Sequence, residues 1–169
     1  MPAQALDLTA LYESHARQVW RMAVRLGVAP ANVEDAVQEV FLIAHRQTRA
    51  FAGRSSASTW LIGIAVKVAA TYRRKQSRGT VPLVEALAAP GRGPDEELEQ
   101  RQRLYELEDV LRRLPPEQRE IVVLCDLEQL TAPEVAEVLE VNVNTVYSRL
   151  RLGRAALTRA LTEVGKDSS

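Results

Sequence analysis

Six residues near the C-terminal end of the chain carry side chains of the kinds that read DNA bases: Asn144, Thr145, Tyr147, Ser148, Arg149 and Arg151. Their amides, hydroxyls and guanidinium groups can hydrogen-bond to base edges in the major groove, whereas Arg154 and Arg159 suit phosphates. Val143, Val146 and Leu150 recur among them at helical spacing. We therefore expect one helix whose apolar side faces a core and whose polar side faces a ligand.

The residues before this helix predict another helix and a tight turn. Thr131 can cap the first helix, and Glu134, three residues later, can complete a capping box. Pro133 in its first turn lacks only an amide that has no partner there. Asn142 is a candidate N-cap for the polar helix. The pattern predicts a helix-turn-helix motif. The alternative is an ordinary pair of packed helices with a solvated arginine face.

The charge of the chain is balanced in total but uneven along its length. The 169 residues include 22 basic and 22 acidic ones. Residues 1–79 and 141–169 carry net charges of +6 and +3, whereas residues 80–100 and 101–140 carry −4 and −5. Because non-specific DNA affinity comes mainly from neutralising phosphates, zero net charge predicts weak binding to free DNA. A larger partner would then supply further contacts.

Several classes of protein are disfavoured by what the sequence lacks. Cys125 is the only cysteine, and with His15 and His45 it offers no metal-ligand spacing, so we expect no metal or cofactor. We find no Gly-rich phosphate loop and no nucleophile paired with a base, so we expect no enzyme. No long apolar segment and no signal-peptide pattern are present, which predicts a cytoplasmic protein without membrane insertion.

Helical periodicity and its breaks predict an all-α fold of two small helical domains. We expect helices over about residues 9–28, 33–48 and 59–76, the second of them capped by Asn32. Another helical unit begins near Asp95, is broken at residues 114–116 and continues to about Leu161. Residues 77–94 are rich in Pro and Gly and show no period. The domains are therefore expected at residues 8–76 and 101–162, joined by a flexible acidic linker over residues 77–100.

Two stretches of the first domain, residues 33–46 (VEDAVQEVFLIAHR) and 51–65 (FAGRSSASTWLIGIA), resemble region 2 of bacterial sigma factors. Residues 114–124 (LPPEQREIVVL) and the helix-turn-helix after them are similar to region 4. Two regions in this order with a short linker resemble the extracytoplasmic-function (ECF) group of the sigma-70 family. The resemblance covers nearly the whole chain outside the linker and both tails.

The resemblance implies a dissociable subunit that binds core RNA polymerase, recognises the −35 and −10 promoter elements and aids DNA opening. In the family, the second helix of region 2 docks on a coiled coil of the largest polymerase subunit. The matching positions here are Asp35, Gln38, Glu39 and Phe41. The polymerase flap and an anti-sigma factor are further expected partners. From the residues alone, an exposed acidic stripe is ordinarily a solvated helix face.

The basic helix of region 2 and the loop before it correspond to the part of the family that opens the −10 element and holds an unstacked base. The residues that this resemblance assigns to opening are Phe51, Arg54, Ser55, Ser56 and Trp60, with Lys67, Arg73 and Arg74 meeting phosphates. The alternative for Trp60 is a place in the hydrophobic core. The chain departs from the family pattern at Glu140, where the turn often has Gly, and at Tyr147, where a cation is common.

Two other functions fit part of the pattern. An autonomous helix-turn-helix regulator would explain the C-terminal half but would leave the region 2 pattern unused, and such proteins usually dimerise to span half-sites. A protein-binding helical scaffold would leave both basic zones unexplained. Binding to core polymerase separates a sigma factor from both. By the same resemblance the linker would pass through the polymerase towards the transcript channel, and a solvated tether is the alternative.

Overall fold

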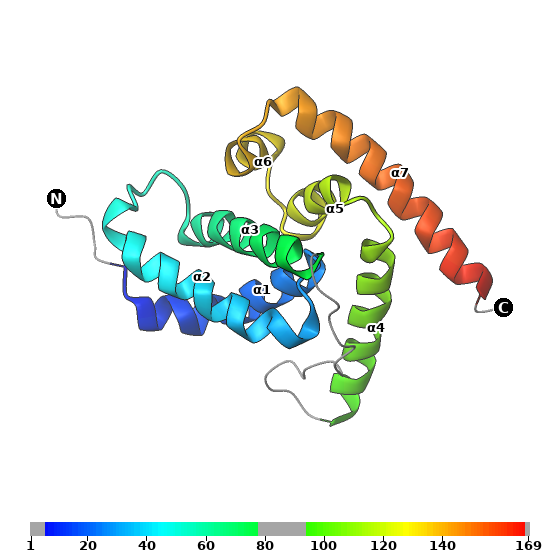
Figure 1. Ribbon diagram of the computed structural model, residues 1–169, viewed down its shortest axis with the longest axis horizontal. Helices are drawn as coiled ribbons and strands as arrows, with labels where there is room; N and C mark the ends of the chain where they lie inside the picture. Colours follow the sequence, from blue (N-terminus) through cyan, green and yellow to red (C-terminus); the bar gives the residue numbers. More distant parts are fainter. Residues whose placement is uncertain (1–5, 78–93, 168–169) are drawn as a thin grey trace. The chain divides into compact units, whose positions relative to one another are not determined.

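The computed structural model describes residues 6–77 and 94–167, and every regular element within these ranges is helical (Figure 1). The predicted all-α class is confirmed. The chain divides into two compact units, residues 1–89 and 90–169. Most of the predicted linker lies outside the described residues. Its last part, residues 94–100, belongs to helix α4.

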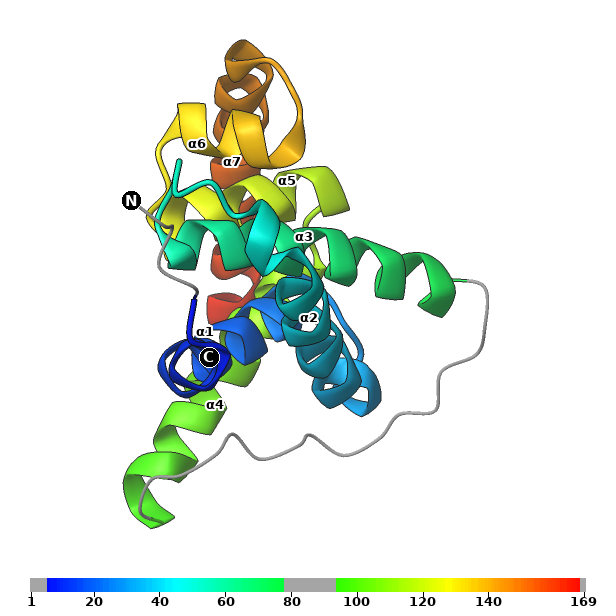
Figure 2. The ribbon, with the colours of Figure 1, turned by 90° about the vertical axis from the view of Figure 1, so that its left-hand side faces the viewer.

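The first unit contains three helices, α1 (Leu8–Arg25), α2 (Val33–Gln47) and α3 (Ala57–Gln76), and each packs against the other two (Figure 1, Figure 2). Short 3₁₀ turns, η1 (Pro30–Asn32) and η2 (Thr48–Ala50), flank α2. The side chains that fill the space between the helices include Met22, Leu26, Val40 and Leu61, all buried. Burial of this apolar surface is what holds α3 in place for the functions considered below.

Local capping interactions define the ends of α1 and α3 but not the start of α2. The Asp7 carboxylate accepts the Thr9 N–H at 3.0 Å. The Ser56 hydroxyl accepts the Thr59 N–H at 3.1 Å and so starts α3 slightly earlier than predicted. The predicted Asn32 cap is wrong: η1 leads directly into α2, Asn32 already has helical dihedral angles, and its side chain makes no capping bond.

The second unit contains α4 (Pro94–Arg112), α5 (Pro116–Val122), a π-helical turn η3 (Val123–Leu127), α6 (Ala132–Leu139) and α7 (Val143–Asp167). Helices α4, α5 and α6 all contact α7, the long C-terminal helix in Figure 1. Ile121, Leu124, Val135 and Val146 have no exposed surface and form the centre of this unit. Helix α7 therefore serves both as the main support of the unit and as the carrier of the polar face predicted from the sequence.

Candidate DNA-binding and docking surfaces

Helices α6 and α7 form the helix-turn-helix expected from the sequence. The capping box is present, since the Glu134 N–H donates to the Thr131 hydroxyl at 3.4 Å and the Thr131 N–H donates to Glu134 Oε2 at 2.8 Å. Asn142 caps α7, because its Oδ1 accepts the Asn144 N–H at 2.8 Å. Between them Glu140 has a left-handed backbone with φ 55°. Gly adopts this conformation freely, whereas other residues lose roughly 1–3 kcal/mol in it.

The polar face of α7 is only partly open to solvent. Four of the six predicted base-reading residues are exposed, namely Asn144, Tyr147, Ser148 and Arg151, while Thr145 and Arg149 are half-buried. Val146 and Leu150 on the opposite side are buried, as expected. Nη2 of Arg149 lies 3.8 Å from Oε2 of Glu117 on α5, a distance at which the two charges attract each other without a direct hydrogen bond.

A glycine sets the close approach of α7 to α5. A Cβ atom on Gly153 would lie 2.8 Å from Cγ2 of Val122 and 3.0 Å from the backbone oxygen of Gln118, closer than real side chains pack. Immediately after it, Arg154 donates from Nη2 and Nε to Oδ1 and Oδ2 of Asp126 in η3, at 2.6 and 3.0 Å. These hydrogen bonds raise the pKa of Arg154.

The ion pair gives Arg154 a partner that the sequence did not predict. Its guanidinium ties α7 to η3, and the phosphate contact expected from sequence stays a prediction. Arg159, one and a half turns further along α7, is exposed. Neither Gly153 nor Asp126 was predicted as a functional position. The only local signal was a glycine within a strongly helical pattern, which commonly marks close packing.

The loop before α3 brings two aromatic rings together. Phe51 and Trp60 are both half-buried, with ring centroids 5.0 Å apart and planes tilted by 43°. Trp60 is thus neither fully in the core nor fully in solvent. Arg54 and Ser55 are exposed in the same loop. Ser56, predicted to act with them on DNA, is also exposed and is the N-cap of α3.

The basic residues of α3 have different environments. Lys67 and Arg74 are exposed, as a phosphate contact requires. Arg73 is half-buried, and its Nη1 donates to the backbone oxygen of Leu26 at 2.7 Å. This bond holds the Arg73 guanidinium at the end of α1, and the phosphate contact predicted for Arg73 stays a prediction.

Of the four residues in the predicted stripe on α2, two contact neighbouring helices and two are exposed. Asp35 and Gln38 are exposed. Glu39 accepts a hydrogen bond from Tyr72 on α3, and burial, this bond and the nearby carboxylates together raise the pKa of Tyr72. Phe41 packs edge-on against Tyr12 of α1, with centroids 4.9 Å apart and an interplanar angle of 64°. Gln38 and Asp35 remain open to a partner.

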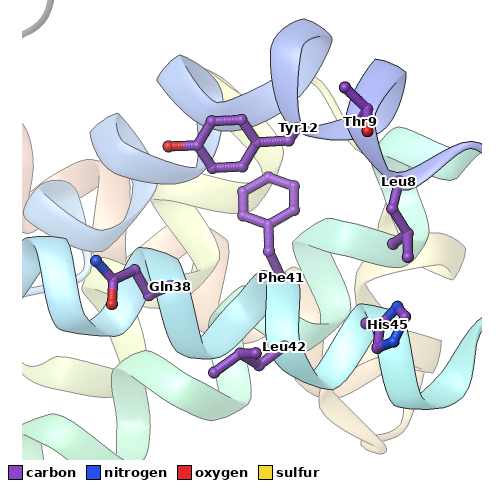
Figure 3. A pocket seen from close by; sticks show the side chains of 7 residues that line it. All are labelled: Leu8, Thr9, Tyr12, Gln38, Phe41, Leu42 and His45. Carbon is purple, nitrogen blue, oxygen red and sulfur yellow. The ribbon is translucent and has the colours of Figure 1, made fainter.

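Beside this stripe lies an open depression of about 450 Å³ between α1 and α2, lined by Leu8, Thr9, Tyr12, Gln38, Phe41, Leu42 and His45. Figure 3 shows the Tyr12 and Phe41 rings meeting between the two helices, with Gln38, Leu42 and His45 along α2. Leu42 is 55% exposed and Tyr12 50%, so the depression presents neighbouring apolar surfaces to solvent. Sequence patterning did not predict this depression, because its residues come from two helices that only the tertiary fold brings together.

Residues 6–77 and 94–167 contain no group of three or more His, Cys, Asp or Glu that could hold a metal ion. No helix in these ranges is long and apolar enough to cross a bilayer. Cys125 is half-buried in η3, and burial followed by the charge of Asp126 raises the pKa of its thiol.

Comparison with known proteins accounts for both units. Residues 11–79 match the family model for sigma-70 region 2, and residues 104–157 match that for sigma-70 region 4. The ECF RNA polymerase sigma factor SigM of Mycobacterium tuberculosis is 32% identical over 152 residues, which cover 89% of this chain and 75% of SigM. The chain belongs to the ECF sigma factors of the sigma-70 family. The ECF sigma-E factor of Escherichia coli is 33% identical over 141 residues, 77% of this ECF sigma factor and 74% of its relative.

Solved structures show the same fold. The sigma factor RpoE of Bartonella quintana, in complex with the anti-sigma factor NepR, has a TM-score of 0.73 at 20% identity and covers 92% of this chain and 97% of its own. CnrH in complex with the cytosolic domain of CnrY has a TM-score of 0.69 at 22% identity, covering 92% and 88%. As a sigma factor, the protein binds core RNA polymerase and promoter DNA and directs transcription initiation. Its α7 continues beyond the region 4 match, to Asp167.

Proposed function

We propose that the two units of this ECF sigma factor divide promoter recognition between them. The first unit docks on core polymerase, contacts the −10 element and aids its opening, and the second unit reads the −35 element. The observation that carries the proposal is the chemistry of two exposed faces within the matched regions: an acid-and-amide stripe on α2 and an amide, hydroxyl and guanidinium face on α7. We assign no catalytic step to the chain, since phosphodiester chemistry belongs to the polymerase.

Docking uses α2 and the depression beside it. The Asp35 carboxylate and the Gln38 amide can accept hydrogen bonds from a basic partner helix, for which the coiled coil of the largest polymerase subunit is the proposed ligand. Tyr12 and Leu42 supply apolar surface that a partner can bury at the centre of the contact. Glu39 contributes to docking through its charge, because its carboxylate already accepts a hydrogen bond from the Tyr72 hydroxyl. The second unit would meet the polymerase flap.

Reading of the −35 element is assigned to the exposed face of α7. Asn144, Ser148 and Arg151 offer amide, hydroxyl and guanidinium groups to base edges, and Thr145 lies at the margin of this face. Tyr147, with 57% of its surface exposed, stands where a cation is common in the family and favours an apolar contact such as a thymine methyl group. Arg149, half-buried with its Nη2 3.8 Å from Oε2 of Glu117, retains guanidinium donors for a base edge.

Opening of the −10 element is assigned to the loop before α3. An unstacked base needs an aromatic surface that replaces the lost stacking, and the Phe51–Trp60 pair supplies one. Arg54 and Ser55 are exposed beside it and can hold the displaced strand. Lys67 and Arg74 extend the contact to phosphates along α3.

Regulation by an anti-sigma factor is part of the proposal, because the solved relatives RpoE and CnrH are each bound to a partner, the anti-sigma factor NepR and the cytosolic domain of CnrY respectively. An occupant of the α1–α2 depression would compete with the polymerase, since Gln38 and Phe41 belong to both surfaces. The protein is proposed to act in the cytoplasm together with polymerase. The autonomous regulator is not favoured, because it leaves the region 2 match without a role.

The experiment that tests the proposal compares the isolated chain with its complex with core polymerase. A duplex promoter selected from a randomised library by the complete holoenzyme serves as the DNA. With a net charge of zero, the isolated chain is expected to bind this duplex weakly, while the holoenzyme binds and opens it. Footprinting and a fluorescent-base opening assay provide the measurements. Tight, sequence-specific footprints from the chain alone would instead support an autonomous regulator.

Alanine replacement of Asp35 and Gln38 together is expected to weaken binding to core polymerase on the order of tenfold, or about 1.4 kcal/mol. Both side chains are exposed, so the melting temperature should stay close to that of the wild type. The matched control replaces Gln100 and Glu106, which are exposed on α4, with Ala. Fluorescence anisotropy of labelled chain with core polymerase measures the affinity. Equal polymerase affinity for the two double variants would remove α2 from the docking surface.

A further inference from the structure

The C-terminal end of α3 is tied to the turn between α1 and α2 by three hydrogen bonds. Gln76 Oε1 accepts the Ala29 N–H at 2.7 Å, and Gln76 Nε2 donates to the Gly27 oxygen at 3.1 Å. One turn earlier, Arg73 donates to the Leu26 oxygen at 2.7 Å. All three bonds are partly buried and join residues 47 to 49 positions apart in the chain. We call this set of contacts the α3 staple.

The staple provides hydrogen-bond partners for backbone groups at the end of α1 and in the turn after it, which helical hydrogen bonds do not satisfy. Leu26 is the C-cap of α1, and Gly27 after it has a positive φ of 92°. Carbonyls at such a helix end need donors from elsewhere, and the Gln76 amide and Arg73 guanidinium provide them. A single glutamine here both donates and accepts, a combination that Glu, Lys or an apolar residue of similar length cannot reproduce.

The same contacts restrain the residues that would face DNA. Arg74 and Lys75 stand between Arg73 and Gln76 in the last turn of α3 and are both exposed. The Arg74 guanidinium donates to Thr71 at 3.2 Å, and the Lys75 ammonium lies 5.5 Å from the centre of the Tyr72 ring. Final turns of helices fray readily, because their carbonyls lack partners. Anchoring both ends of this turn keeps the two exposed cations on a defined helical surface.

We infer that Gln76 is a positioning residue for promoter binding, which holds Arg74 and Lys75 in register with the phosphates near the −10 element. The inference rests on the proposed role of α3 in DNA contact. The staple orders this turn when the protein folds. The entropy cost of ordering it is therefore not added to the free energy of DNA binding. Removing the staple should therefore reduce the number of phosphate contacts without removing any charge.

The test measures how holoenzyme affinity for the library-selected duplex promoter depends on salt concentration. The full chain is assembled with core polymerase as wild type, Gln76→Met, Arg74→Ala, the double variant and the control Gln47→Met, an exposed glutamine at the end of α2. Arg74→Ala is expected to flatten the log–log slope by about 0.9, the value of one phosphate contact. Gln76→Met is expected to flatten it by at least as much, and the double variant should resemble Gln76→Met alone. Gln47→Met should retain the wild-type slope.

The possible failures are distinguishable. A wild-type slope for Gln76→Met with a flattened slope for Arg74→Ala overturns the positioning role only, as do additive effects in the double variant. A wild-type slope for Arg74→Ala overturns the phosphate role of the α3 end and the inference with it. If Gln76→Met unfolds below the assay temperature, Arg73→Lys decides the question, because it disturbs the staple at constant charge. A flattened slope then supports the inference, and an unchanged one overturns it.

Discussion

Alanine in place of Phe51 is expected to slow promoter opening by the holoenzyme about tenfold to a hundredfold, while binding through the −35 element stays unchanged. Stacking of a base on an aromatic side chain contributes about 1–3 kcal/mol, and Phe51 forms half of the aromatic pair with Trp60. Without it the extruded base loses stacking surface that offsets the cost of leaving the duplex. A fluorescent base within the −10 element of the holoenzyme complex reports the opening rate.

Two controls separate opening from folding and from −35 recognition. Phe51→Tyr keeps the ring and should open promoters at nearly the wild-type rate. A premelted template should rescue Phe51→Ala, because unstacking has already occurred on that DNA. Failure of premelting to rescue the variant, or an altered −35 preference, would contradict the proposed division between the two units.

Valine in place of Gly153 is expected to lower the free energy of unfolding of the second unit by about 2–4 kcal/mol. Its Cβ alone would lie 2.8 Å from the buried Val122 side chain and 3.0 Å from a backbone oxygen. The backbone oxygen of Gln118 cannot move aside as the end of a flexible side chain can, so α7 must shift away from α5. With the base-reading face displaced, transcription that depends on the −35 element should fall in parallel.

Chemical denaturation of the full chain tests this prediction with a built-in reference. Both tryptophans, Trp20 and Trp60, belong to the first unit. Their fluorescence should keep the wild-type midpoint, whereas part of the helical circular dichroism should be lost at a urea concentration about 1–2 M lower. Gly165→Val is the matched control on the same helix, because a Cβ there meets nothing within 4 Å. Equal midpoints for the two valine variants would show that α5 and α7 do not require glycine at their crossing.

The elements that sequence predicted well are those governed by neighbours along the chain. The capping box at Thr131 and Glu134 and the cap at Asn142 involve residues two or three positions apart, so spacing alone is sufficient. The inward Val146 and Leu150 followed from helical periodicity in the same way. The predicted cap at Asn32 was wrong because Pro30–Asn32 forms a 3₁₀ turn that leads directly into α2. Composition alone does not distinguish such a turn from an extended residue that caps a helix.

Sequence did not predict the partners that several cations and hydroxyls of the candidate sites have within the protein. Arg73 and Arg154 looked like phosphate ligands, yet the first binds the end of α1 and the second binds Asp126, 28 residues away. A guanidinium has the same donors for a carbonyl, a carboxylate or a phosphate, so its residue type does not reveal its partner. Only the folded chain shows which of these acceptors lies within reach.

Sequence by itself determined the helical class, the two regions and the helix-turn-helix, because these depend on periodicity, caps and motif order within short stretches. Tertiary structure decided which side chains remain available to a ligand. It paired Phe51 with Trp60, joined Tyr12 and Leu42 in one depression and tied Gln76 to the turn after α1. Such contacts form between different elements of the fold, and their geometry follows from how the helices bury their apolar faces against one another.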